Sequence, residues 1–290
     1  TKINDATPLY NIQVPLESDE RHEASILAKN NIWIFSKKYD PSLKEMSLLV
    51  RQYDANTGAE KGSVRKISSL ESDALGNKGR NFYIKLSPDE SKLMIVSEFQ
   101  WKKKAQNVTI DVYEAVDLKK ISTCKTLDTF NTILIENFDY LVDNAGGVSY
   151  LFKYVVTREQ QKTGIGIGKT IAAKSMVLEL TTDRDIELGE TKLELTENNN
   201  LIVGGIFYDK LSDAERDADK EAKAGIFAYF VNGADLSLME KNLDYFNTDV
   251  YTKLTYVSGT IRKKPGQKYY KYYGTQTVKG STFILFTHRN

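Results

Sequence analysis

The sequence predicts an all-β protein, a β-propeller with four blades and the beginning of a fifth. The main observation is a largely apolar run that recurs along the chain, begins at Ile32, Leu93, Tyr150 and Leu201, and is predicted to be the first strand of each unit. The starts are separated by 61 (93−32), 57 (150−93) and 51 (201−150) residues. After each run come a further strand-like run, a turn rich in Asp, Asn, Thr or Gly, and a third run. Short strands with turn signals at such a spacing are typical of radially repeated sheets.

The composition agrees with a folded β protein. Of the 290 residues, 41% are hydrophobic and 27% are charged, which is usual for a globular protein. The 17 Tyr and 12 Phe against 5 Pro favour strands, because aromatic side chains fit half-buried pleated surfaces. A formal charge of +1 gives no reason to expect nucleic-acid binding or attraction to an anionic membrane. No apolar run reaches the length of a transmembrane helix.

Four units follow one another along the chain. In each, the turn between the later strands contains residues that cap the chain or adopt positive φ. These turn residues include Asp54 and Gly58, then Asp117, then Asp183, then Gly233. We predict blades over residues 25–70, 80–128, 132–195 and 196–245.

The end of the chain departs from this repeat. The next apolar run, Phe283–Phe286, starts 82 residues (283−201) after its predecessor, so residues 246–268 are predicted to form an extra connection. The sequence stops at Asn290, directly after that run. We therefore expect residues 1–290 to form one incomplete propeller with a partial blade at 268–290, closed by further residues or by a partner. A β-sandwich is the alternative, because it also has short strands and regular turns.

One segment carries a family resemblance. Leu86–Val96 contains Ser87-Pro88-Asp89 before an apolar run and resembles the strand entry of WD40-like and TolB-like β-propellers. Glu90 stands where those families prefer Gly, and the chain has no Trp-Asp or Gly-His pair. The closer similarity is to secreted or envelope-associated bacterial propellers. That resemblance implies a binding platform at a periplasmic, cell-surface or extracellular location.

The glycine-rich segment Gly164–Thr170 invites comparison with a phosphate-binding loop. Thr163 stands where that loop needs a glycine, and the residues that follow Thr170 predict a strand rather than a helix. Without a helix N-terminus the loop has no amide groups to meet a phosphate. We expect a flexible hairpin loop here and no nucleotide.

Other chemical motifs are weak. Five acidic residues between Asp213 and Glu221 could hold calcium, but basic residues are interleaved and the central glycine of the calcium loop is missing. His22 and His288, the two histidines, have no neighbours at the spacing of a nucleophile or a metal ligand. Cys124, the single cysteine, cannot form an internal disulfide or a cysteine zinc cluster. We therefore predict no catalytic residue, no cofactor and no metal.

The best candidate for a partner contact is Trp101, in the connection 99–107 between two strands. A large ring on a loop can bury a wide area at low entropic cost, and the neighbouring Lys102, Lys103 and Lys104 would form the rim. The run Tyr269–Tyr273 is more simply explained as a strand with one aromatic face.

These observations predict a non-enzymatic interaction platform, a subunit of a bacterial envelope or extracellular assembly with protein partners. The alternative is a glycan-binding module or a hydrolase with its site at the mouth of the propeller. An enzyme should gather acidic or His side chains from several blades at that mouth. A platform should present an apolar, aromatic patch instead.

Overall fold

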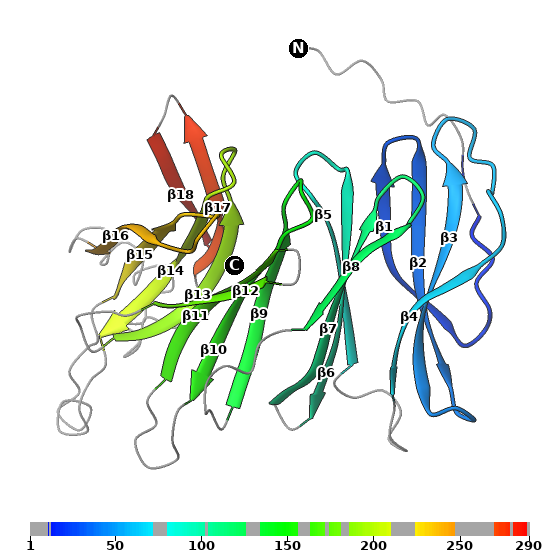
Figure 1. Cartoon of the computed structure of the whole chain (residues 1–290), viewed down its shortest axis with the longest axis horizontal. Coiled ribbons are helices and arrows are strands. Elements are labelled where there is room, and N and C mark those ends of the chain that lie inside the picture. Colours follow the sequence, from blue (N-terminus) through cyan, green and yellow to red (C-terminus); the bar gives the residue numbers. More distant parts are fainter. Residues whose placement is uncertain are drawn as a thin grey trace, which may run out of the picture.

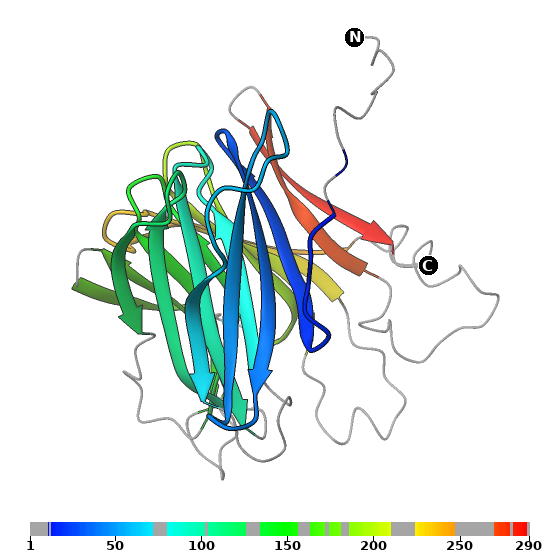
Figure 2. The ribbon, with the colours of Figure 1, turned by 90° about the vertical axis from the view of Figure 1, so that its right-hand side faces the viewer.

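The chain folds into five antiparallel sheets, four with four strands and one with two (Figure 1). The computed structural model describes residue 11 and residues 13–71, 80–101, 104–125, 134–155, 163–171, 174–180, 186–209, 224–246, 270–278 and 281–288. Within these ranges the regular elements are strands. The sheets stand one after another in an arc, and Figure 2 looks onto the first of them. The predicted all-β propeller class is confirmed, and the two face-packed sheets of a sandwich are not observed.

In each four-stranded sheet, neighbouring strands are also neighbours in the sequence. The first sheet consists of β1 (Glu20–Ala28), β2 (Asn31–Asp40), β3 (Glu45–Asp54) and β4 (Arg65–Glu71). The second consists of β5 (Arg80–Leu86), β6 (Lys92–Trp101), β7 (Lys104–Glu114) and β8 (Lys120–Lys125). The third consists of β9 (Leu134–Val142), β10 (Val148–Val155), β11 (Thr163–Ile171) and β12 (Lys174–Leu180). The fourth consists of β13 (Ile186–Leu195), β14 (Leu201–Asp209), β15 (Ala224–Val231) and β16 (Leu238–Tyr245), and the fifth of β17 (Tyr270–Val278) and β18 (Ser281–His288).

The first strand of each sheet is the inner one. Contacts run from β1 to β5, from β5 to β9, from β9 to β13 and from β13 to β17. The recurring apolar runs were predicted to be first strands, and this is wrong: they lie in the second strands β2, β6, β10 and β14. A second strand has a partner on both edges and a neighbouring sheet on one or both faces, so part of its sequence is a run of apolar residues. An inner strand such as β1 mixes buried and exposed positions and has a weaker signal.

Two further expectations need correction. The repeat spacing puts Leu188–Leu195 at the end of the third blade, but β13 pairs with β14 and opens the fourth sheet. Gly164–Thr170 was expected to be a hairpin loop, but these residues belong to β11, which pairs with β10 on one side and β12 on the other. The third blade therefore obtains its third strand from the segment that resembles a phosphate loop.

The glycines of β11 make room for aromatic rings. Tyr150 lies opposite Gly168 and Phe152 lies opposite Gly166 in the β10–β11 register. A Cβ atom on Gly168 would lie 2.0 Å from Cζ of Tyr150, and one on Gly166 would lie 2.3 Å from Cζ of Phe152. Each ring therefore lies across the backbone of the neighbouring strand, where any larger residue would displace it.

Three hydrophobic cores join consecutive sheets. Alternate residues of β6 show how one strand serves two of them, because successive side chains point to opposite faces. Leu93 and Ile95 belong to the core shared with Trp33 of the first sheet. Met94 and Val96 belong to the core shared with the third sheet. A third core joins the third and fourth sheets. Each of these fully buried side chains contributes about 1.5–3 kcal/mol to folding.

The turn between the first and second strands recurs with the same geometry. Glu90, Gly146 and Asn199 occupy it with φ of 59°, 87° and 59°. This left-handed conformation explains why propeller families prefer Gly at the position of Glu90. The Ser87 hydroxyl donates to Asp89 at 2.7 Å, and the Ser91 amide donates to the same carboxylate at 2.9 Å. Burial alone would raise the pKa of Asp89, but these hydrogen bonds lower it to about 2.

Packing runs from each sheet to the next. In the described part of the chain, no comparable packing joins the first sheet to the fifth. The fifth sheet has two strands among the described residues, where the other sheets have four. What completes the ring stays a prediction.

Candidate functional site

Five polar or aromatic residues meet where the inner strands of the second and third sheets lie side by side. We call them the inner-strand cluster. They are Tyr83 and Lys85 of β5, Glu98 of β6, and Asp139 and Tyr140 of β9.

Glu98 lies on a face of β6 that otherwise carries apolar side chains. Met94 and Val96 point toward the third sheet, and the strand period places Glu98 on the same face. Glu98 is fully buried. The register of β6 with β7 shifts between Ser97 and Phe99, so Glu98 lies at a β-bulge. Bulges re-aim side chains and are frequent beside functional sites.

The hydroxyl of Tyr140 is buried and has no hydrogen-bond partner within the described part of the chain. Its ring centroid lies 5.8 Å from that of Tyr83, at an interplanar angle of 34°. Burial is the main cause that raises the pKa of Tyr140, and the charge of Glu98 raises it further. Tyr140 is therefore a neutral phenol, able to donate and to accept. A buried hydroxyl without a partner costs about 1–3 kcal/mol, so its retention needs an explanation.

The second half of the cluster lies along the edges of the inner strands, where backbone groups have no neighbouring strand to pair with. The Lys85 ammonium donates to the carbonyl oxygen of Tyr140 at 2.9 Å and to Oδ1 of Asp139 at 2.6 Å. The amide of Leu193 in β13 donates to Oδ2 of Asp139 at 3.1 Å. One carboxylate thus links the second, third and fourth sheets.

Solvent reaches the cluster at two of its members. Tyr83 is 39% exposed, and the side chain of Lys85 is also 39% exposed. Asp139, Tyr140 and Glu98 are buried. The cluster thus combines a partly exposed aromatic ring with buried hydrogen-bond donors and acceptors. Such a combination of one flat apolar surface and a few fixed polar groups is what small-molecule sites use.

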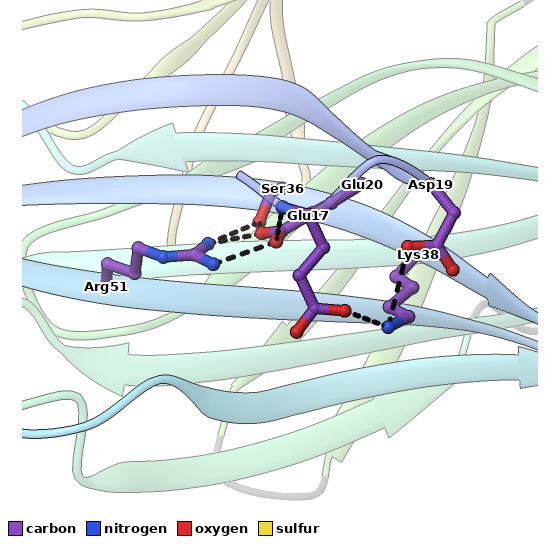
Figure 3. A network of polar contacts seen from close by, with 6 residues as sticks. All are labelled: Glu17, Asp19, Glu20, Ser36, Lys38 and Arg51. Atoms are coloured by element: carbon purple, nitrogen blue, oxygen red, sulfur yellow. Dashed lines mark hydrogen bonds and ion pairs between the residues drawn. The ribbon is translucent and has the colours of Figure 1, made fainter. Parts of the chain in front are cut away.

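A second polar network lies within the first sheet (Figure 3). Oε1 of Glu20 accepts from the Ser36 hydroxyl and from Nη1 of Arg51. Oε2 accepts from Nη2 of Arg51 at 2.8 Å and from the Glu17 amide at 3.2 Å. The hydrogen bonds from Arg51 are the main cause that lowers the pKa of Glu20 from 4.5 to about 2. Because both carboxylate oxygens already have their donors, we interpret this buried ion pair as structural.

The predicted partner contact lies at the end of a hairpin. Trp101 is the last residue of β6 and pairs with Lys104, the first residue of β7. β5 pairs with β6 as far as Phe99, so Trp101 lies beyond the end of the inner strand. Lys102 and Lys103 lie outside the described residues. A partner contact at Trp101 stays a prediction.

The remaining candidates are not brought together into a site. Nε2 of His22 lies 2.9 Å from the hydroxyl of Ser25 on the exposed part of β1. Cys124 is partly buried, and burial raises the pKa of its thiol to about 11. The acidic run 213–221 lies outside the described residues. Within the described ranges, no group of three or more His, Cys, Asp or Glu side chains is placed to hold a metal ion. Nor does that part of the chain contain a helix with the length and hydrophobicity needed to cross a membrane.

Comparison with known proteins finds similarity of architecture. No protein-family model matches the chain, and no curated protein matches it significantly. Among solved structures, the GH93 α-L-arabinofuranosidase of Fusarium graminearum matches with a TM-score of 0.40 and 10% identity over 79% of this chain and 66% of that enzyme, about two thirds of its length. The endo-arabinase of Bacteroides thetaiotaomicron matches with a TM-score of 0.39 and 11% identity, over 93% of this chain and 91% of the other.

The β-propeller domain of the trilobed protease from Pyrococcus furiosus matches with a TM-score of 0.32 and 9% identity, over 81% of this chain and 83% of that one. Similarity at this level concerns the propeller fold and carries no argument about activity. The narrower resemblance to WD40-like and TolB-like propellers stays a prediction.

Sequence reasoning missed every member of the inner-strand cluster. One signal was available, because Glu98 follows Met94 and Val96 at the spacing of two that marks one face of a strand. A carboxylate that continues an apolar stripe is a candidate for a buried functional group. Lys85 and Asp139 gave no comparable signal, since their contact joins residues 54 positions apart across two sheets.

Proposed function

We propose that this protein is a glycan-directed β-propeller that holds a sugar at the inner-strand cluster. The observation that carries the proposal is the buried Tyr140 hydroxyl, which has no hydrogen-bond partner among the described residues. The charge of Glu98 acts on this hydroxyl and raises its pKa. A sugar hydroxyl is both donor and acceptor, so it suits a phenol and a carboxyl group at once. Tyr83 is partly exposed and packs against Tyr140, and its ring is offered as the surface on which a sugar ring stacks.

The platform interpreted from the sequence required an apolar, aromatic patch at the propeller mouth. The side chains of the inner-strand cluster include Lys85, Asp139 and Glu98, which come from two sheets and are polar. Acidic or His side chains gathered from several blades were the expected mark of an enzyme, and the cluster brings Glu98 and Asp139 together from two sheets. The cluster therefore favours the alternative, a glycan-binding module or hydrolase. The periplasmic, cell-surface or extracellular location expected from the sequence belongs to the same proposal.

Cleavage of a glycosidic bond is the second candidate function. Most glycoside hydrolases use two carboxyl groups on either side of the bond. The cluster supplies two carboxyl groups from different sheets in unlike surroundings. Asp139 accepts hydrogen bonds from the Lys85 ammonium and from the backbone amides of Leu193 and Tyr140, whereas Glu98 follows Met94 and Val96 on an apolar face of β6. A difference in surroundings of this kind allows one group to act as an acid and the other as a base.

The proposal is tested by measuring the binding of a panel of oligosaccharides, including arabinan fragments, by isothermal titration calorimetry. Tyr83→Ala should weaken binding of the best ligand by about tenfold or more, which corresponds to about 1.4 kcal/mol of lost stacking. Tyr245→Ala is the matched control, because Tyr245 has a similar exposure of 40% but lies on the outer strand β16. It should leave binding unchanged.

A reducing-sugar assay on the same panel separates cleavage from binding. Glu98→Gln should abolish any hydrolysis and retain binding, because the amide keeps the shape of the side chain. If no oligosaccharide binds, or if a folded Tyr83→Ala protein binds as the wild type does, the proposed function is wrong.

A further inference from the structure

We infer that two copies of this protein pair through the outer edge of β18 and form a dimer whose fifth sheets join into one continuous sheet. The inference goes beyond the proposed function and does not depend on it. The dimer would form whether or not the inner-strand cluster holds a sugar.

β18 holds a place in its sheet where other strands of this fold have two partners. It is the second strand of the fifth sheet, and the second strands β2, β6, β10 and β14 each pair on both edges (Figure 1). Among the described strands, β18 pairs with β17 alone. β17 is the inner strand, since it contacts β13 of the fourth sheet. The outer edge of β18 therefore presents backbone donors and acceptors with which a further strand can pair.

The sequence of β18 is not that of a protected edge strand. Charged residues on an edge hinder pairing with another chain. β18 has no Asp, Glu, Lys or Arg, and its centre reads Phe283-Ile284-Leu285-Phe286. The outer strands of the four-stranded sheets each carry at least two such residues, which include Arg65 and Lys66 in β4, Lys120 and Lys125 in β8, Lys174 and Glu179 in β12, and Glu240 and Lys241 in β16.

The register of the β17–β18 hairpin shows which residues of β18 face the outer edge. Two residues connect the strands, so Val278 and Ser281, which lie opposite each other, form a hydrogen-bonded pair. Successive residues of an antiparallel strand direct their backbone groups to alternate edges. The backbone groups of Thr282, Ile284 and Phe286 therefore face the outer edge.

A second copy of this chain fits that edge. A twofold axis at Ile284 places this residue opposite its own copy, Thr282 opposite Phe286, and Phe283 opposite Leu285. Residues that face the outer edge then meet their equivalents, as antiparallel hydrogen bonding requires. Each pair combines β-branched, aromatic or aliphatic residues and none opposes like charges, so the pairs are of the stabilising kind. The formal charge of +1 adds little repulsion between copies. Twofold self-pairing is also the commonest symmetry of protein dimers.

Analytical ultracentrifugation over a wide range of protein concentrations tests the dimer. The wild type should sediment as a dimer at the highest concentration. Thr282→Pro removes an outward-facing amide from each copy, so it should weaken dimerisation at least about tenfold. Thr277→Pro is the matched control, because Thr277 lies opposite Thr282 but directs its backbone groups away from β18. It should leave dimerisation unchanged.

Cysteine cross-linking tests the register and does not depend on how well a proline variant folds. In a Cys124→Ser background, Ile284→Cys would place two Cα atoms about 5.5 Å apart across the dimer, within the reach of a disulfide. Thr282→Cys would place them about 14 Å apart, beyond that reach. Oxidation should therefore link the Ile284→Cys protein into a covalent dimer and leave the Thr282→Cys protein unlinked.

Three results would overturn the inference. The first is a wild type that stays monomeric at every concentration. The second is a folded Thr282→Pro protein that dimerises as the wild type does. The third is a Thr282→Cys protein that cross-links while the Ile284→Cys protein does not. None of these results bears on sugar binding, which calorimetry tests separately.

Discussion

Removal of the Glu20 carboxylate should destabilise the protein by about 3–5 kcal/mol, the usual cost of breaking a buried ion pair from one side. The Glu20 side chain is fully buried and that of Arg51 is 4% exposed. In Glu20→Ala the Arg51 guanidinium would lose its carboxylate. Among the described residues of the network it would still donate to the Ser36 hydroxyl, which lies 3.1 Å from Nη1. Nε of Arg51 is already buried without a partner among the described residues. The variant therefore leaves a buried cation that is almost unsatisfied.

A double-mutant cycle separates the ion pair from the volume of the side chains. Arg51→Met combined with Glu20→Gln removes both charges and keeps similar shapes, so the double variant should lose less than about 2 kcal/mol. Lys38→Ala is the control, because Lys38 and Glu17 form an ion pair with side-chain exposures of 32% and 66%. This exposed pair should contribute less than about 1 kcal/mol. The cycle consists of the wild type, Glu20→Gln, Arg51→Met and the double variant, and urea unfolding at pH 7 measures these four proteins together with Glu20→Ala and Lys38→Ala.

The same ion pair predicts how stability depends on pH. The pKa of Glu20 is about 2 in the folded chain, below its ordinary 4.5. A lowered pKa gives stability that is fully present above about pH 4.5 and is lost as the pH falls toward 2, and the difference corresponds to roughly 3 kcal/mol. The wild type and the double variant should therefore converge in stability across this range. If Glu20→Ala costs less than about 1 kcal/mol at pH 7, or if the two proteins do not converge, our account of the pair is wrong.

Three further outcomes are expected. Glu90→Gly should raise the free energy of unfolding by about 0.5–1 kcal/mol in urea, because φ of 59° is strained for a residue with a Cβ atom, and Asn199→Gly should gain less because Asn tolerates this conformation. Gly168→Ala should cost about 3 kcal/mol or more in thermal unfolding, because the new Cβ would lie 2.0 Å from the ring of Tyr150. Trp101→Ala should weaken association with a protein partner by about 2 kcal/mol without a change in Tm, whereas a lower Tm with unaltered binding would identify Trp101 as a core residue.

The repeat itself could be predicted from the sequence because the second strands pack against neighbouring sheets. Trp33 and Phe35 are fully buried, and so are Leu93 and Ile95, which makes their runs apolar and easy to recognise. The inner strands could not be recognised in the same way. β1 alternates buried and exposed residues irregularly, and a bulge between His22 and Ala24 interrupts its period. The assignment therefore began each blade one strand too late.

The glycines of β11 show why a motif needs its structural context. Gly166 and Gly168 suit a phosphate loop when read as a string of letters, because glycine permits close approach to the backbone. In the structure the group that approaches is an aromatic ring of β10, and the residue that decides this is the Tyr or Phe directly opposite. That pairing depends on the register of two strands, which is set by tertiary packing as well as by the local sequence.

The inner-strand cluster could not be predicted from the sequence for a related reason. Lys85 and Asp139 each look like ordinary surface charges in the sequence, and their contact exists because two inner strands meet at the axis. The edges of those strands leave backbone groups unpaired, and side chains from the neighbouring sheets satisfy two of them, the Tyr140 carbonyl and the Leu193 amide. The polar residues at the axis are therefore required by the fold before any ligand is considered. The hydroxyl of Tyr140 is the exception, because it is buried and no described group satisfies it. For that reason the proposed site is built around Tyr140 and not around the more conspicuous ion pairs.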